Sequence, residues 1–202
     1  MELIGMLDSP YVRRTAISLR LLGLPFVHRP ISVFSTYAAF AAINPVVKAP
    51  TLVCDDATVL MDSTLIIEHA QALAGRSLLP TGNAERLRTL RLVGLGLAAC
   101  EKSVQIVYEQ QLRPAVRQHA PWLERVTCQL AAAYAELEAE LARRPLAADA
   151  AAITQAGVTT AVAWGFTRLL LPGVVSADDC PAIAAHAAAA ECLADFRALP
   201  MV

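Results

Sequence analysis

The chain has 202 residues, of which 56% are hydrophobic and 17% are charged, and its net charge is −1. This composition supports a sizeable buried core and excludes a disordered chain. The basic residues are scattered rather than aligned in a stripe, which argues against nucleic-acid binding. The first residues, MELIGML, contain no basic start, and no stretch is apolar enough to span a bilayer. We therefore expect a soluble, cytoplasmic protein without a membrane or nucleic-acid partner.

Short apolar runs and proline-marked turns fill the chain as far as residue 76. Gly23 and Pro25 are expected to end the first helix, and Pro30 favours an edge position for the strand around it. In chain order we expect a strand (2–6), a helix (10–22), a strand (26–28 and 31–33), a short helix (36–42), a strand (51–54), its hairpin partner (59–60) and a helix (64–73).

The segment from 46 to 69 contains the most informative pattern. Pro50 lies between two apolar runs and pushes Ala49 toward an extended conformation. If the bond between these two residues is cis, the turn presents the backbone of Ala49 to a peptide-like ligand. Asp62 and Ser63 then precede a helix, where side chains and N–H groups favour an anion.

After a composition change near residues 76–86 the chain is rich in Ala and Leu at helical spacing. This change predicts a first domain over 1–76, a linker over 77–85 and an all-helical domain over 86–202. Thr154 is a natural N-cap for a nearly uncharged helix that is apolar on all sides and therefore central to the bundle. The expected helices span 84–111, 121–141, 153–171 and 178–194, the last with Asp178 and Asp179 near its positive end.

The five cysteines do not indicate a disulfide framework or a metal site. Their number is odd, no two form a CxxC pair, and none has a histidine at metal-ligand spacing. We expect buried apolar thiols and no bound metal; the residues are Cys54, Cys100, Cys128, Cys180 and Cys192.

This order of elements resembles the cytosolic glutathione S-transferases over almost the whole chain. The matching motifs are SPYVRR (9–14), NPVVKAPTL (44–52) and LMDSTLIIEH (60–69). The chain is most similar to the bacterial branch with a Ser-Pro-Phe/Tyr loop. The resemblance implies an α/β thioredoxin-like domain with a mixed four-stranded sheet, followed by an α-helical bundle domain. It also implies a homodimer that uses glutathione as co-substrate, needs no cofactor and acts in detoxification.

In this family Ser9 stands at the position that activates the thiol. Its hydroxyl at the positive end of a helix is suited to stabilise the glutathione thiolate. The alternative is that Ser9 is only an N-cap of that helix. Cys54 is the nearest other nucleophile, but it follows an apolar run and is expected in the core.

The resemblance assigns the remainder of glutathione to the segment around Pro50. Asp62 would pair with the γ-glutamyl ammonium and Ser63 would bind the γ-glutamyl carboxylate, although both also suit a plain helix cap. Ala49, before Pro50, would use its backbone toward the cysteinyl unit. Lys48 would meet the glycyl carboxylate, or else remain a solvated surface charge.

A small, hydrophobic electrophile is expected in a groove between the two domains, beside Tyr11 and a long helix that carries Gln105 and Tyr108. Tyr108 either donates to negative charge developing on the electrophile or packs between helices. Arg13 and Arg14 either lie near the site or pair with acids at the domain interface.

The chain departs from the family pattern at Gly157, where the family has an aspartate that completes a capping box. Two functional classes follow from the sequence. The first is a glutathione-dependent enzyme that performs conjugation, with an isomerase or dehalogenase as a narrower alternative. The second is a binding or regulatory protein that keeps the fold with little turnover.

Overall fold

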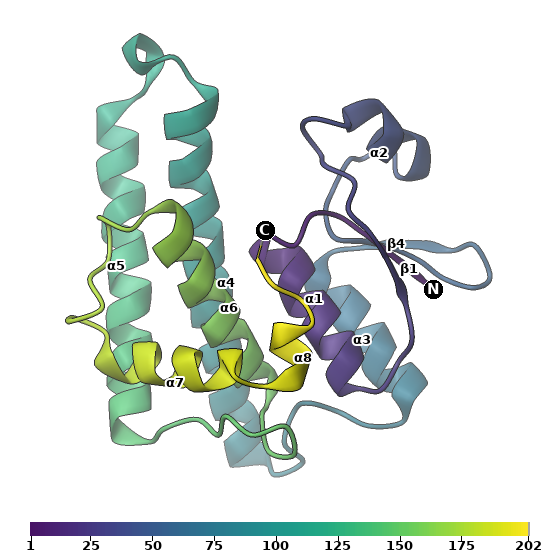
Figure 1. Ribbon diagram of the computed structural model, residues 1–202. Helices are drawn as coiled ribbons and strands as arrows, with labels where there is room; N and C mark the ends of the chain where they lie inside the picture. Colours follow the sequence, from purple (N-terminus) through teal and green to yellow (C-terminus); the bar gives the residue numbers. More distant parts are fainter. Residues whose placement is uncertain (202) are drawn as a thin grey trace. The chain divides into compact units, whose positions relative to one another are not determined.

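The computed structural model describes residues 1–201 and divides into two compact units (Figure 1). The first, called the N-terminal unit below, comprises Met1–Leu78 together with the chain from Leu193 onward. The second, called the helical unit, is Leu79–Cys192. No helix in the described residues is long and apolar enough to cross a membrane.

A mixed four-stranded sheet organises the N-terminal unit, in the order β2-β1-β3-β4. β1 pairs in parallel with β2 and antiparallel with β3, and β4 forms a hairpin with β3. β2 is an edge strand, as Pro30 predicted, but residues 31–33 do not extend it: the strand ends before Pro30, which has no N–H to donate. The strands are β1 (Glu2–Ile4), β2 (Val27–Arg29), β3 (Thr51–Val53) and β4 (Val59–Met61).

Two helices lie side by side against the sheet and bury the core of this unit (Figure 1). They are α1 (Pro10–Leu21) and α3 (Ser63–Ala74), while α2 (Tyr37–Ile43) precedes β3. Leu3 and Leu52 from the strands and Ile17 and Ile66 from the helices are completely buried. This unit therefore has the α/β architecture expected from the sequence.

The last described residues return to α1 (Figure 1). After α8 (Ala194–Arg197), the carbonyl of Leu199 accepts a hydrogen bond from Arg13 Nε at 2.8 Å. The Arg13 guanidinium also lies over the ring of Phe196, 5.7 Å from its centroid. Because Arg13 is almost fully buried, these contacts fix the final segment against α1.

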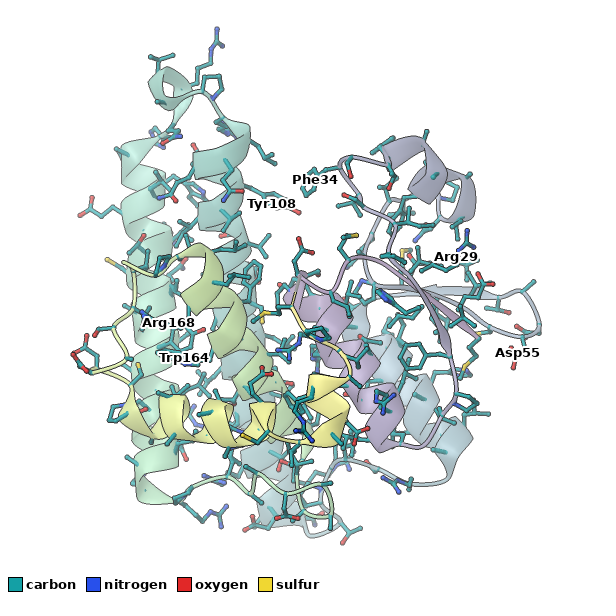
Figure 2. All side chains as sticks on the ribbon, in the orientation of Figure 1. Arg29, Phe34, Asp55, Tyr108, Trp164 and Arg168 are labelled. Atoms are coloured by element: carbon teal, nitrogen blue, oxygen red, sulfur yellow. The ribbon has the colours of Figure 1, made fainter. Side chains whose placement is uncertain are left out.

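The helical unit consists of long helices around a buried centre. Twelve of the sixteen residues of α6 are buried, which confirms its predicted central position. The Tyr134 hydroxyl donates to the carbonyl of Ala163, and the Tyr134 and Trp164 rings meet edge to face. Figure 2 shows Arg168 beside Trp164. The elements are α4 (Asn83–Leu112), the 3₁₀ turn η1 (Ala115–Arg117), α5 (Ala120–Arg143), α6 (Gln155–Leu170) and α7 (Pro181–Glu191).

The start of α6 differs from the expected cap. Thr154 occupies the N-cap position, but its side chain makes no capping hydrogen bond. A Cβ atom at Gly157 would lie 2.9 Å from Ile153 Cγ1 and 3.3 Å from the ring of His186. That ring is buried, and its Nε2 lies 3.1 Å from the Gly157 carbonyl. The close packing of Ile153, with the imidazole beside it, therefore leaves little room for a side chain at Gly157.

α7 begins at Pro181, later than predicted, so Asp178 and Asp179 lie just before the helix, near its positive end as expected but outside its first turn. The carboxylate of Glu138, on α5, accepts hydrogen bonds from the N–H groups of Ala182 and Ile183, each at 2.9 Å. A side chain distant in sequence thus satisfies the orphan donors of this helix.

The expectation of uniformly buried thiols is wrong in part. Cys100 and Cys180 are buried, Cys54 is intermediate, and Cys128 and Cys192 are exposed. The two exposed residues lie on the outer face of α5 and just after the end of α7. In this chain cysteine is therefore not restricted to the core.

Candidate functional site

The predicted site residues of the N-terminal unit gather on the turn before β3 and at the starts of α1 and α3. Gly5, in the loop between β1 and α1, has φ 137°, and a Cβ there would lie 2.5 Å from Val12 Cγ2 and 3.3 Å from Ala49 Cβ. The loop that leads to Ser9 therefore passes directly against Ala49. Only glycine accommodates both this approach and this backbone conformation.

Ser9 is the N-cap of α1. Its Oγ accepts a hydrogen bond from the N–H of Val12 at 3.4 Å, and Pro10 follows as the first helical residue. The cap predicted as an alternative role is therefore present, and it is long for a hydrogen bond. Because the Ser9 oxygen only accepts in this contact, the hydroxyl hydrogen can donate to a further group.

The turn before β3 contains the bond between Ala49 and Pro50, which is cis. The Thr51 hydroxyl donates to the Lys48 carbonyl at 2.8 Å, and Asn44 Nδ2 donates to the Thr51 oxygen at 2.8 Å. Asn44 and Thr51 are both buried. These bonds hold the backbone on both sides of Ala49 in one conformation.

Asp62 is the N-cap of α3 and has a positive φ of 72°. Its Oδ1 accepts from the N–H of Thr64 at 2.9 Å, and its Oδ2 accepts from Lys48 Nζ at 3.3 Å. Partial burial opposes ionisation of Asp62, but the Thr64 N–H and the Lys48 ammonium together hold its pKa below the usual value. The carboxylate is thus charged at neutral pH and accessible to a cation.

Ser63 follows as the first residue of α3 and is buried, with 3% of its surface exposed. Its Oγ accepts a hydrogen bond from Arg14 Nη1 at 2.8 Å, and the hydroxyl of Thr64 accepts from the same nitrogen at 3.3 Å. The sequence left the role of Arg14 open. No local pattern identifies this contact, because 49 residues separate Arg14 from Ser63.

Cys54 does not lie in the core as predicted, because β3 ends at Val53 and the chain enters the hairpin turn. Figure 2 shows Asp55 on this turn. The Cys54 sulfur lies 4.0 Å from His69 Nε2. Burial and the carboxylates of Asp56 and Asp55 raise the pKa of Cys54, so the thiol is poorly suited to act as a nucleophile. Within the described residues, no three metal-ligating side chains gather in one place.

The residues predicted beside the electrophile belong to both units. Tyr11 lies in the first turn of α1, and its carbonyl accepts from the Thr15 hydroxyl at 2.9 Å. Gln105 and Tyr108 lie on α4 of the helical unit. Gln105 Nε2 donates to Glu101 at 3.0 Å, and Tyr108 is 43% exposed. Figure 2 labels Tyr108 on the ribbon. This partial exposure of Tyr108 is compatible with both roles that the sequence left open, donation to the electrophile and packing between helices.

Residues 3–78 match the N-terminal domain of glutathione S-transferases. The chain is 27% identical over 174 residues, or 86% of both chains, to YibF, an uncharacterised GST-like protein of Escherichia coli K12. A glutathione S-transferase from Methylobacterium radiotolerans, in complex with glutathione sulfonate, is 23% identical with a TM-score of 0.90, over 100% of this chain and 95% of that chain. A glutathione transferase family member from Pseudomonas fluorescens Pf-5, with bound glutathione, is 26% identical with a TM-score of 0.83, over 100% and 98%.

Proposed function

The chain belongs to the glutathione S-transferase family, and we propose that it is an enzyme that joins the thiolate of glutathione to a small electrophile. The observation that supports this proposal best is the start of α3. An ionised Asp62 there stands next to the buried hydroxyl of Ser63, at the positive end of a twelve-residue helix. Such a pair of opposite polarities suits the γ-glutamyl end of glutathione, which carries an ammonium and a carboxylate.

In the proposed complex, the γ-glutamyl ammonium binds Asp62 and the carboxylate binds Ser63. The ion pair of Lys48 with Asp62 is largely exposed, and such a pair contributes at most about 1 kcal/mol. The ammonium of the ligand can therefore replace Lys48 at little cost, which leaves Lys48 to bind the glycyl carboxylate. The backbone of Ala49, held before Pro50, pairs with the cysteinyl unit.

Ser9 is the proposed activating residue. The thiol of glutathione has a pKa of about 8.5 when free, so most of it is protonated at neutral pH. A hydroxyl that donates to sulfur at the start of α1 favours the thiolate, and each unit of pKa lowering corresponds to about 1.4 kcal/mol. One hydrogen bond to a charged acceptor is strong enough to supply this amount.

Titration calorimetry with millimolar glutathione tests binding, and a panel of aryl and alkenyl electrophiles tests turnover. Ser9→Ala is expected to keep glutathione affinity within about threefold and to lower the rate by about tenfold or more. Ser176→Ala is the matched control, because this serine also accepts from a nearby backbone N–H but lies in the helical unit.

The binding and turnover experiments each have an outcome that contradicts one part of the proposal. Absence of glutathione binding contradicts the proposed function. Binding without turnover of any electrophile favours the alternative of a binding or regulatory protein. An unchanged rate and unchanged thiolate absorbance in Ser9→Ala would exclude Ser9 as the activating residue.

Tyr11, Gln105 and Tyr108 are proposed to contact the electrophile. Tyr108 is partly exposed, and a phenol hydroxyl is suited to donate to negative charge that develops on the electrophile. Tyr108→Phe is then expected to lower turnover several-fold for electrophiles with a carbonyl or nitro group and to leave alkyl halides unaffected. Equal rates for both substrate classes in this variant would contradict the role.

A further inference from the structure

Arg14, on α1, places a positive charge against the start of α3. Its side chain is 1% exposed, and Nη1 donates to the hydroxyls of Ser63 and Thr64 at 2.8 and 3.3 Å. Burial of a guanidinium is unfavourable unless its N–H groups find acceptors. Here two acceptors are the first two side chains of the helix at which the γ-glutamyl carboxylate is proposed to bind.

This contact fixes the polarity of the Ser63 hydroxyl. A guanidinium can only donate, so the Ser63 oxygen is the acceptor and its own hydrogen is left to donate to another group. The positive end of α3 adds to the charge of Arg14 at the same point. One residue earlier, Asp62 is negative. The helix start is therefore divided into a donor half at Ser63 and an acceptor half at Asp62.

From this geometry we infer that Arg14 is a positioning residue that makes Ser63 select ligands with a free carboxylate at the γ-glutamyl end. The inference rests on the proposed function, because it concerns the same site. It adds the group that determines the specificity of that site: Arg14 acts through the Ser63 hydroxyl rather than by touching the peptide.

Two truncated peptides separate the halves of the site. In 4-aminobutanoyl-cysteinyl-glycine only the α-carboxylate of glutathione is missing, whereas in glutaryl-cysteinyl-glycine only the ammonium is missing. Titration calorimetry gives the affinity of the full-length protein for each peptide and for glutathione. A hydrogen bond to a charged group predicts that the wild type binds the decarboxylated peptide about tenfold or more weakly than glutathione.

The test compares Arg14→Met with Arg13→Met. Both arginines are 1% exposed and adjacent on α1, but the bond of Arg13 Nε goes to the carbonyl of Leu199, whereas Arg14 Nη1 donates to Ser63. Arg14→Met is expected to reduce the preference for glutathione over the decarboxylated peptide to about twofold or less. Its preference for glutathione over the glutaryl peptide should stay unchanged, because Asp62 is intact. Arg13→Met should keep both preferences even if it lowers the melting temperature.

Arg14→Lys gives a second variant should the methionine variant fail to fold. It retains the charge but lacks the rigid fork that reaches two hydroxyls, so the preference should fall to about threefold. Wild-type binding of all three peptides with equal affinity overturns the inference and leaves the proposed function standing. A wild-type preference in the Arg14 variants that fold also overturns it. No glutathione binding by the wild type instead refutes the proposed function.

Discussion

The starts of α3 and α6 both have a polar residue before an apolar helix. Charged side chains surround the start of α3, whereas the start of α6 is closely packed. At α3, Asp62 caps the helix, pairs with Lys48 and stands beside a serine held by a buried arginine. At α6, the Thr154 side chain makes no cap bond, and a neutral imidazole packs against Gly157 instead.

The difference separates binding from packing. A helix cap needs one side-chain acceptor, which the ionised carboxylate of Asp62 supplies at α3. The lysine and the arginine at the same helix start exceed that need. At the start of α6 the first residues are buried, and an imidazole ring packs against the Gly157 carbonyl. Polar groups beyond those that a cap requires indicate a ligand site, whereas a tightly packed glycine indicates a structural role.

The strongest test of this contrast is Gly157→Asp, which introduces the acidic residue that would complete a capping box at the start of α6. The sequence pattern alone predicts stabilisation, but the new Cβ would lie 2.9 Å from Ile153 and the carboxylate would be buried. We expect a loss of about 3 kcal/mol in the free energy of unfolding, measured with urea at pH 8. Gly94→Ala is the control, since a Cβ there meets nothing and should stabilise α4 by up to about 1 kcal/mol. Stabilisation by Gly157→Asp would contradict the packing explanation.

Removal of the distant cap of α7 should have the next largest effect. Glu138→Ala leaves the N–H groups of Ala182 and Ile183 without their acceptors, and we expect a loss of about 2 kcal/mol in urea unfolding. Glu136→Ala on the same helix removes only an exposed pair with Arg91 and should change stability by less than about 0.5 kcal/mol. Equal losses in both variants would show that the cap contributes nothing beyond a surface charge.

The buried imidazole at α6 predicts a pH dependence of stability. Burial lowers the pKa of His186 below its unfolded value of about 6.5, and the bond with Gly157 opposes this only in part. Between the two pKa values the unfolded chain binds more protons, so stability falls as pH falls below about 6.5, by at most about 1.4 kcal/mol per unit. Unfolding midpoints of the wild type and His186→Gln from pH 8 to 5 measure this: the wild type should lose more stability than the variant. Parallel profiles would contradict the prediction.

The smallest expected change in stability, Asp62→Asn, separates capping from binding at α3. Asparagine caps a helix about as well as aspartate, so urea unfolding should change by less than about 0.5 kcal/mol. The affinity for glutathione should nevertheless fall about tenfold, because the ammonium loses its charged acceptor. Asp149→Asn, at a turn whose carboxylate accepts from two backbone N–H groups, should leave affinity unchanged. An unchanged affinity in Asp62→Asn would reduce Asp62 to a cap.

Local sequence signals predicted most of the N-terminal unit. Proline and glycine bounded the first helix, Pro30 marked the edge strand, and the polar pair at 62–63 marked the start of α3. These signals act within a few residues, through backbone dihedral angles and missing donors. The apolar surface of α6 likewise predicted its central position, because burial on all sides leaves no face for water.

The predictions that failed depend on neighbours far away in the chain. Thr154 occupies the N-cap position of α6 as expected, but its side chain makes no cap bond, and the ring of His186, 29 residues beyond Gly157, packs against the first turn. Cys54 was expected in the core because it follows an apolar run, yet the strand ends one residue earlier. A short stretch of sequence does not show which side chain from a distant part of the chain contacts the end of a helix.

The sequence by itself determined the order of helices and strands, the family resemblance and the candidate residues Ser9, Asp62 and Ser63. Only the tertiary structure decided which buried charge stands behind that site, by bringing Arg14 to Ser63 across 49 residues. The physical reason is that backbone conformation is set by neighbours along the chain. The direction of a hydroxyl and the pKa of a carboxylate are instead set by whichever groups the packing of helices places within hydrogen-bond distance.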